Sequence, residues 1–294
     1  MDTLSERNAY LLDIAEFSLD GGEFMPEEEI LRLDNVCREA LGFVERGGHV
    51  AQPWVLEPET IEHYVTLRFN INSEIDYEGA ELALEDAEKA KIIFNGNEIA
   101  NNIKGWYVDK DIKTVPLTNI KKGENILEIT LPFGKRTNTE WCYLLGNFGV
   151  RVTGSEKIIT ALPEKLGFGS IVNQGLPFYG GNITYHLESE GKAFVIEATR
   201  YRGALISVSI DGETKGKIVY PPYHLEIDGL GAGNHKIDIT LFGNRFNGFG
   251  AVHLTDNKHS WHGPGAWRSD EECWSYEYVL RDVGILARPI IKAK

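Results

Sequence analysis

The sequence has few cysteines and few methionines. The scarcity of cysteine argues against a fold held together by disulfides and against a zinc site. Its 294 residues include 3 cysteines and 2 methionines. Cys37, Cys142 and Cys273 are odd in number, lie far apart and match no metal-ligand spacing. A disulfide framework and a zinc site are therefore both unexpected. Three reduced thiols are the simplest interpretation, and they indicate a reducing compartment.

Long apolar runs are also missing. No stretch approaches the roughly 20 apolar residues that cross a bilayer. The first residues, starting at Met1, show no basic segment followed by an apolar core, so no signal peptide is predicted. For the chain as given we therefore expect a soluble, cytoplasmic protein that has no membrane partner; for a fragment of a longer protein, this start predicts no location.

Positive charge is scarce relative to negative charge. The chain has 30 lysines and arginines against 44 aspartates and glutamates, for a formal net charge of −14. Such a balance repels phosphate backbones, so we expect no nucleic-acid partner. The glycine-rich run 229–233 precedes a strand pattern and not a helix, and it therefore predicts no phosphate-binding cofactor site. The histidines His253, His259 and His262 have no carboxylate or cysteine in register, so no metal is predicted.

Short alternating strands dominate what is present. Glycine is frequent at 31, and aromatic residues make up 11% of the chain, a mixture typical of short strands joined by tight turns. Apolar and polar residues alternate over four segments, 64–71, 127–131, 204–210 and 237–241. One-sided burial of this kind indicates antiparallel sheets. The dipeptides Asn95-Gly96 and Asp211-Gly212 readily supply the positive φ angles that tight hairpins need.

One segment, 26–41, has helical periodicity. Pro26 suits the first helical position, and the three glutamates after it place negative charge on the positive end of the helix dipole. Apolar residues then recur at helical spacing up to Leu41, and Gly42 provides a stop. We expect this helix to brace a β domain or to dock a preceding domain.

An internal repeat is the most informative feature of the sequence. Residues 123–138 read GENILEITLPFGKRTN, and residues 233–247 read GNHKIDITLFGNRFN. With one extra residue at Pro132, the glycines, the Ile-Thr-Leu strand and the Phe-Gly-x-Arg-x-Asn tail coincide. Upstream, IFNG at 93–96 matches SIDG at 209–212, and downstream NFG at 147–149 matches GFG at 248–250. Three matches in the same order predict a duplicated domain.

The predicted fold is therefore all-β, with two tandem antiparallel β-sandwich domains and a short N-terminal helical segment. We expect a helical and linker segment over 1–55, a first β-sandwich over 56–155 and a second over 156–294. The boundary between the two sandwiches lies within 153–162.

At the repeats the sequence resembles the sugar-binding-type β-sandwich domains of large bacterial glycoside hydrolases. The first repeat carries the pattern in the hairpin 92–99, in KTVPL at 113–117 and in KGENILEI at 122–129. The second repeat gives YPPY at 220–223, LFGNR at 241–245 and WHGP at 261–264. The resemblance covers roughly 76–294. It implies galactose-binding-like jelly rolls, as in the non-catalytic C-terminal region of hydrolases related to α-L-rhamnosidases and to the β-galactosidase and β-glucuronidase family.

The resemblance implies an accessory region that binds an oligosaccharide or polysaccharide, or that has a structural role. In that family the catalytic carboxylates lie in a barrel that precedes such domains, and nothing in this sequence alternates strands with long helices. A glycoside hydrolase catalytic domain or subunit is thus an expected partner. Two alternatives stay open: a glycosidase, lyase or auxiliary subunit with its site in a sandwich cleft, and a structural oligomerisation module.

Glycan binding by sandwich domains relies on aromatic faces that stack on sugar rings, with amides, acids and arginine bonding the hydroxyls. Aromatic residues cluster at 261–278 in a Gly/Pro-rich stretch, and a second aromatic and amide-rich segment runs from 173 to 182. The predicted glycan-binding residues are Trp261, Trp267, Trp274, Arg245, Asn247, Tyr179, Asn182 and Trp141. Structural roles are the alternatives: a plug at the open end of the second sandwich for the tryptophans, a corner of the repeat for Arg245 and Asn247, and a linker for 173–182.

Catalysis by this chain is not predicted. Retaining and inverting glycosidases need two carboxylates that flank one bond. Glu85, Asp86 and Glu140 are the candidates, but Glu85 and Asp86 belong to an acidic run that is typical of a solvated face. We therefore assign no catalytic residue.

Overall fold

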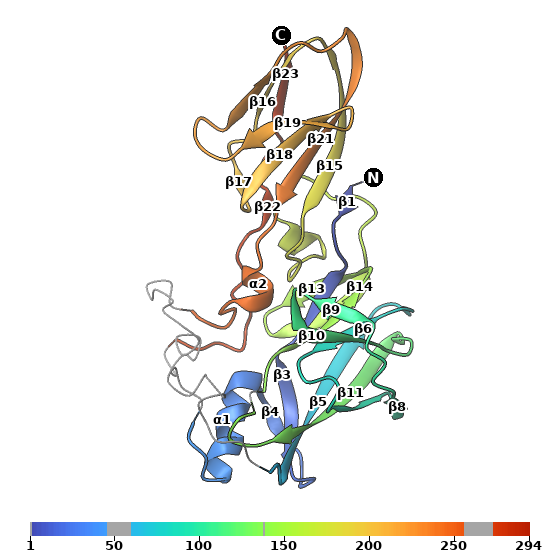
Figure 1. Cartoon of the computed structure of the whole chain (residues 1–294), viewed down its shortest axis with the longest axis vertical. Coiled ribbons are helices and arrows are strands. Elements are labelled where there is room, and N and C mark those ends of the chain that lie inside the picture. The colour runs from blue at the N-terminus through green and yellow to red at the C-terminus, as the bar shows by residue number, and fades with distance from the viewer. Residues whose placement is uncertain (1, 46–59, 138, 256–272) are drawn as a thin grey trace. The chain divides into compact units, whose positions relative to one another are not determined.

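The computed structural model describes residues 2–45, 60–137, 139–255 and 273–294, and it is all-β, as predicted. The chain forms two compact units (Figure 1). We call the unit formed by 9–161 and 253–279 the first sandwich, and the unit formed by 2–8, 162–252 and 280–294 the second sandwich. Both units are discontinuous in sequence, which the predicted ranges 1–55, 56–155 and 156–294 do not anticipate.

The first sandwich contains two sheets. One sheet has the strand order β2-β12-β6-β10-β9, and the other has the order β13-β14-β5-β11-β7-β8, with β3 beside β5 and β4 beside β3. Their bounds are β2 Asn8–Leu12, β3 Ile14–Leu19, β4 Met25–Glu29, β5 His63–Ser73, β6 Glu81–Leu84, β7 Lys91–Phe94, β8 Asn97–Ile99, β9 Gly105–Tyr107, β10 Asp109–Pro116, β11 Gly123–Phe133, β12 Cys142–Gly146, β13 Phe148–Thr153 and β14 Glu156–Ala161.

The core of the first sandwich follows the predicted alternation. Along β5, Val65, Leu67 and Phe69 are at most 2% exposed, while the residues between them face outward. Strand β11 runs antiparallel to β5 along its whole length and alternates in the same way (Figure 1). Strand β2 differs, because all five of its residues are buried. Such a strand carries no period-2 signal, so the sequence pattern could not indicate it.

Strand β5 changes partners along the edge opposite β11. Its first half pairs antiparallel with β3, from Val65 to Arg68. Its last residues, Asn72 and Ser73, pair in parallel with β14. Between these two pairings, no strand of the described chain pairs with residues 69–71 on this edge. The switch leaves a gap in the sheet, and the gap positions the site described below.

The helix is present, but it begins later than predicted. Residues Met25–Glu29 form strand β4 against β3, and helix α1 covers Ile30–Ala40. Glu29 caps the helix by accepting a hydrogen bond from the Arg32 backbone N–H at 3.1 Å. Gly42 follows the C-cap with a φ of 66°, as a helix stop requires. Pairing with β3 therefore takes precedence over helix propensity before Glu29.

The second sandwich has one larger sheet, two small sheets and two short helical turns. The sheets have the orders β1-β15-β21-β18-β19, β20-β16-β23 and β17-β22. Their bounds are β1 Thr3–Leu4, β15 Ile183–Gly191, β16 Phe194–Glu197, β17 Tyr201–Arg202, β18 Leu205–Ile210, β19 Glu213–Ile218, β20 His224–Ile227, β21 Gly233–Phe242, β22 Gly284–Ile285 and β23 Ile290–Ala293; η2 is Ile171–Gln174 and α2 is Phe246–Phe249.

The sequence repeat occupies equivalent places in the two units. Strand β11 lies between β5 and β7, and β21 lies between β15 and β18. Strands β7 and β18 each continue through a hairpin into the next strand, and their turn residues Asn95 and Asp211 both have positive φ. The side-chain oxygen of Asn95 accepts a hydrogen bond from the Ile126 backbone N–H, and that of Asp211 accepts one from the Lys236 backbone N–H, both at 2.9 Å. Ile126 and Lys236 are each the fourth residue of their repeat. The duplication therefore extends to the turn chemistry.

Among the described helices, none is long and apolar enough to cross a membrane.

Candidate functional site

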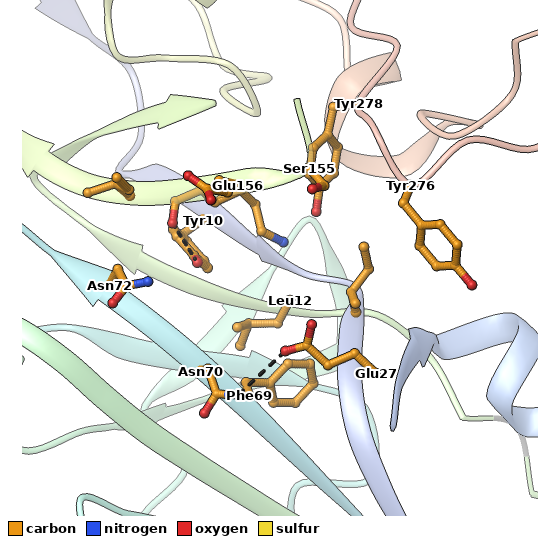
Figure 2. Close-up of a pocket in the computed structure, with 13 residues that line it drawn as sticks. Tyr10, Leu12, Glu27, Phe69, Asn70, Asn72, Ser155, Glu156, Tyr276 and Tyr278 are labelled. Atoms are coloured by element: carbon orange, nitrogen blue, oxygen red, sulfur yellow. Dashed lines mark hydrogen bonds between the residues drawn. The ribbon is translucent and has the colours of Figure 1, made fainter. Parts of the chain in front are cut away.

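A hollow of about 500 Å³ opens in the first sandwich, at the gap along β5 (Figure 2). We call it the β5 hollow. It is lined by Tyr10, Leu12, Ile14, Glu27, Phe69, Asn70, Asn72, Ser155, Glu156, Lys157, Ile158, Tyr276 and Tyr278. Specific small-molecule sites are typically concave and of about 300–1,000 Å³, so the size suits a sugar unit or a short oligosaccharide.

Five separate segments build the hollow. Strand β5 contributes Asn70 and Asn72 from its outward face, on either side of the change of partner strand. Strand β14 adds residues 156–158, and the neighbouring segments at 10–14 and 27 add apolar and acidic groups. The last contribution is Tyr276 and Tyr278, which come from the chain some 120 residues after β14.

The lining combines aromatic rings with hydrogen-bonding groups. Tyr276 is 45% exposed, and its hydroxyl donates to the Glu28 carboxylate at 3.1 Å. The Asn70 amide donates to Glu27 at 3.4 Å. Figure 2 shows Glu27, Asn70 and Asn72 around the same opening as Tyr10 and Tyr276. Rings beside amides and carboxylates are the groups that bind sugars, since the ring covers the apolar sugar face and the polar groups bond its hydroxyls.

A buried ionic network lies behind one wall of the hollow. Asp13, at 0% exposure, accepts from the Lys157 ammonium at 2.5 Å, from the Tyr278 hydroxyl at 2.7 Å and from His253 Nε2 at 3.0 Å. Burial alone would raise the pKa of Asp13, but the Lys157 ammonium and the hydrogen bond from His253 overcome it and lower the pKa to about 2. Asp13 is thus ionised and holds two lining residues, Lys157 and Tyr278, in place.

His253 faces acceptors on both sides of its ring. Its Nδ1 lies 2.8 Å from the Ser275 carbonyl, and its Nε2 lies 3.0 Å from the Asp13 carboxylate. The ring therefore bridges Ser275 and Asp13, and Asp13 also accepts from the Lys157 ammonium.

The network fastens the segment that carries the two tyrosines. Leu254 and Trp274 form an antiparallel bridge, and the Tyr278 backbone N–H donates to the Gly154 carbonyl at 3.0 Å. The Arg32 guanidinium lies over the Trp274 ring, 4.7 Å from its centroid. The wall formed by Tyr276 and Tyr278 is thus held by several independent contacts.

A second buried acid lies at the start of helix α1. Glu29 is 2% exposed and accepts from the Trp141 indole N–H at 2.6 Å. Burial raises the pKa of Glu29 to about 7, although the Trp141 hydrogen bond offsets part of this effect. Trp141 is itself 8% exposed, and its polar edge is directed at Glu29.

Two of the predicted glycan-binding residues, Trp261 and Trp267, lie outside the described residues. Trp274 and Trp141 belong to the first sandwich, where they contact Arg32 and Glu29. Neither of them lines the β5 hollow. Sugar contact by these tryptophans stays a prediction.

The other four predicted residues belong to the second sandwich, where their polar groups form internal bonds. Tyr179 is 2% exposed, and its hydroxyl donates to the Asn182 carbonyl at 2.8 Å. Arg245 forms a two-pronged ion pair with Glu6, with both N···O distances at 2.7 Å. Asn247 exchanges two 2.9 Å hydrogen bonds with the Arg281 backbone. The contacts of Arg245 and Asn247 suit a structural corner, which is the alternative prediction for the repeat tail.

Most residues of the β5 hollow could not be predicted from the sequence. Asn70 lies in the alternating segment 64–71, and Tyr276 and Tyr278 belong to the aromatic stretch 261–278. Nothing in the sequence connects them with Tyr10 or Lys157. Two amides at i and i+2 on the outward face of a strand, Asn70 and Asn72, were the one local signal available.

Fold and site together define an all-β, sandwich-type protein with an aromatic and polar hollow on one sheet. No family model matches the chain, and no curated protein matches it. Among solved structures, the chain is similar to a GH2 β-galacturonidase from Eisenbergiella tayi bound to glycerol, at 10% identity and a TM-score of 0.28, with 80% of this chain and 36% of that chain covered.

Two further solved structures show the same kind of similarity. One is a rhamnosidase from Novosphingobium sp. PP1Y, at 14% identity and a TM-score of 0.29, with 80% of this chain and 23% of that chain covered. The other is a β-D-mannosidase from Dictyoglomus thermophilum, at 12% identity and a TM-score of 0.28, with 81% and 31% covered. This chain thus spans well under half of each of these three structures.

Proposed function

We propose that this chain is an accessory carbohydrate-binding region of a glycan-processing protein, and that the β5 hollow is its binding site. The observation that carries the proposal is the lining of the hollow, which combines the exposed ring of Tyr276 with the polar groups of Asn70, Asn72 and Glu27. The resemblance of the repeats to sugar-binding-type domains supports it from the sequence. A glycoside hydrolase catalytic domain or subunit is the partner that fits this role.

The exposed tyrosine provides the test. Replacement of Tyr276 by Ala removes a ring from the rim of the hollow, and we expect about tenfold weaker glycan retention because ring–sugar contacts are worth roughly 1 kcal/mol. Affinity electrophoresis in gels containing plant and host polysaccharides measures this retention. Tyr64→Ala is the matched control, because Tyr64 is 50% exposed on β5 and does not line the hollow.

Retention that is equal in the wild type, Tyr276→Ala and Tyr64→Ala would remove the β5 hollow from the proposal. Retention of no glycan by the wild type would leave a structural role as the function. Circular dichroism of each variant separates lost binding from lost folding.

Hydrolysis in the same hollow is the second candidate, because Glu27 and Glu156 place two carboxylates around one opening. Both side chains are exposed. A general acid must stay protonated near neutral pH, which enzymes achieve mainly by burial. Binding is therefore the better supported function, and product release from aryl glycosides that is lost in Glu27→Gln would favour the enzyme instead.

A further inference from the structure

We propose that the β5 hollow selects neutral and amino sugars over acidic sugars, and that Glu27 and Glu156 determine this preference. The inference rests on the proposed function, and it adds the charge of the ligand. Its basis is the distribution of charge around the hollow.

The lining carries an excess of negative charge. Glu27 and Glu156 are exposed carboxylates, and Lys157 is the one cation among the described lining residues. Lys157 is 10% exposed in its side chain, and its ammonium donates to Asp13 at 2.5 Å and to the Leu11 carbonyl at 2.6 Å. Its charge is matched by Asp13, and two of its three N–H donors are already used, so it offers little to an anionic ligand.

Two described arginines near the hollow, Arg32 and Arg68, are already paired with carboxylates. Arg32, next to the rim, is paired with Glu28 at 3.0 Å. Arg68, two residues before Asn70 on β5, lies between Glu128 at 2.8 Å and Glu16 at 3.5 Å. Both guanidinium groups are therefore already neutralised by carboxylates, and the chain as a whole has a net charge of −14.

The hydrogen-bonding chemistry agrees with the charge. Ionised carboxylates can only accept, so Glu27 and Glu156 suit ligands that donate through hydroxyl or ammonium groups. A sugar carboxylate donates nothing and repels both side chains. An ammonium on the sugar ring gains two charge-assisted partners at the same positions.

The experiment uses the full chain and matched trios of oligosaccharides. Each trio shares configuration and linkage and differs in a single substituent: a hexose, its amino sugar and its uronic acid. We expect the uronic acid to bind roughly tenfold more weakly than the hexose at low salt, because the carboxylates of Glu27 and Glu156 repel the sugar carboxylate at close range. Microcalorimetry or array binding measures the ratio.

Two variants test whether Glu27 and Glu156 cause the weaker binding of the uronic acid. Glu27→Gln with Glu156→Gln keeps the shape of the hollow, and we expect it to bring the uronic acid to within about twofold of the hexose. Glu88→Gln, an exposed carboxylate that does not line the hollow, removes one charge elsewhere and leaves the ratio unchanged. Ionic strength near 1 M, where the Debye length is about 3 Å, also reduces the ratio in the wild type.

The outcomes distinguish this inference from the proposed function. Hexose binding that depends on Tyr276, with a uronic acid bound equally well or better, overturns the charge preference and leaves the binding site standing. An unchanged ratio in the double glutamine variant overturns the assignment to Glu27 and Glu156. Binding of no member of any trio removes both the inference and the proposed function.

Discussion

Asp13 is a buried carboxylate that the Lys157 ammonium and the His253 ring both contact. Lys157 and His253 approach its two carboxylate oxygens from different parts of the chain, at 2.5 and 3.0 Å. A buried cation without a counter-charge costs several kcal/mol, so the stability of this region depends strongly on one side chain.

Asp13→Asn tests that dependence. The amide keeps the shape of the carboxylate but removes its charge, and it leaves the buried Lys157 ammonium without a counter-ion. We expect the free energy of unfolding to fall by about 3 kcal/mol or more, measured by urea denaturation at neutral pH. Asp111→Asn, at an exposed position of β10, is the control, and its effect should stay within about 0.5 kcal/mol.

The same residue predicts a dependence on pH. The pKa of Asp13 is lowered from 3.8 to about 2 in the folded protein, so its contribution is fully present above about pH 4 and is lost as the pH falls towards 2. The lowering corresponds to roughly 2 kcal/mol. The difference in stability between wild type and Asp13→Asn should therefore narrow across this range. A constant difference from pH 6 to pH 2 would contradict the role assigned to Asp13.

The two tight hairpins are equivalent elements in the two units. Gly96 and Gly212 have φ angles of 76° and 85°, and an added Cβ at either position would meet nothing within 4 Å. Because space is available, the cost of alanine at either glycine comes only from the backbone conformation. The same replacement of glycine by alanine can therefore be tested in both copies of the turn.

Gly96→Ala and Gly212→Ala should each lower the free energy of unfolding by about 1 kcal/mol, the cost of a left-handed conformation for an L-residue. Thermal denaturation measures the shift in each variant. Gly231→Ala provides the matched control, since this glycine also has open space but no positive φ. It should be neutral or slightly stabilising. A loss at Gly231 as large as at Gly96 would refute the conformational explanation.

At the level of elements, the sequence predicts those strands that are buried on one face only. The alternation in β5, β11, β18 and β21 and the two hairpins follow directly from the sequence, because each is a local pattern. Strand β2, buried on both faces, has no such pattern. Strand β4 contradicts the predicted helix start, because pairing with β3 outweighs the helix signals of Pro26 and the glutamates.

The whole molecule depends on contacts that no local pattern contains. The last stretch of the chain divides between the two units, with 253–279 in the first sandwich and 280–294 in the second. The β5 hollow depends on this division, because its lining residues Tyr276 and Tyr278 belong to the stretch that is part of the first sandwich. The change of partner strand on β5 likewise joins β3 and β14, which are more than 130 residues apart. Sequence periodicity carries no record of such pairings.

Each unit nevertheless has its own core, and the repeat supplies one matched position in both. Ile129 of β11 and Ile239 of β21 are the seventh residues of the two repeats, and both are 0% exposed. Ile129→Ala and Ile239→Ala remove the same atoms from equivalent strands. Each should lower the stability of its own unit by roughly 2–5 kcal/mol.

Native-state hydrogen exchange can assign each loss to a unit. Ile129→Ala should reduce protection of strand amides in residues 9–161, and Ile239→Ala should reduce it in residues 162–252. Protection in 253–255 and 273–279 should follow Ile129→Ala, while protection in 280–294 should follow Ile239→Ala, because these stretches belong to different units. If residues 273–279 lost protection in Ile239→Ala and not in Ile129→Ala, the division of the C-terminal stretch would be wrong, and the segment that carries Tyr276 would belong to the second sandwich.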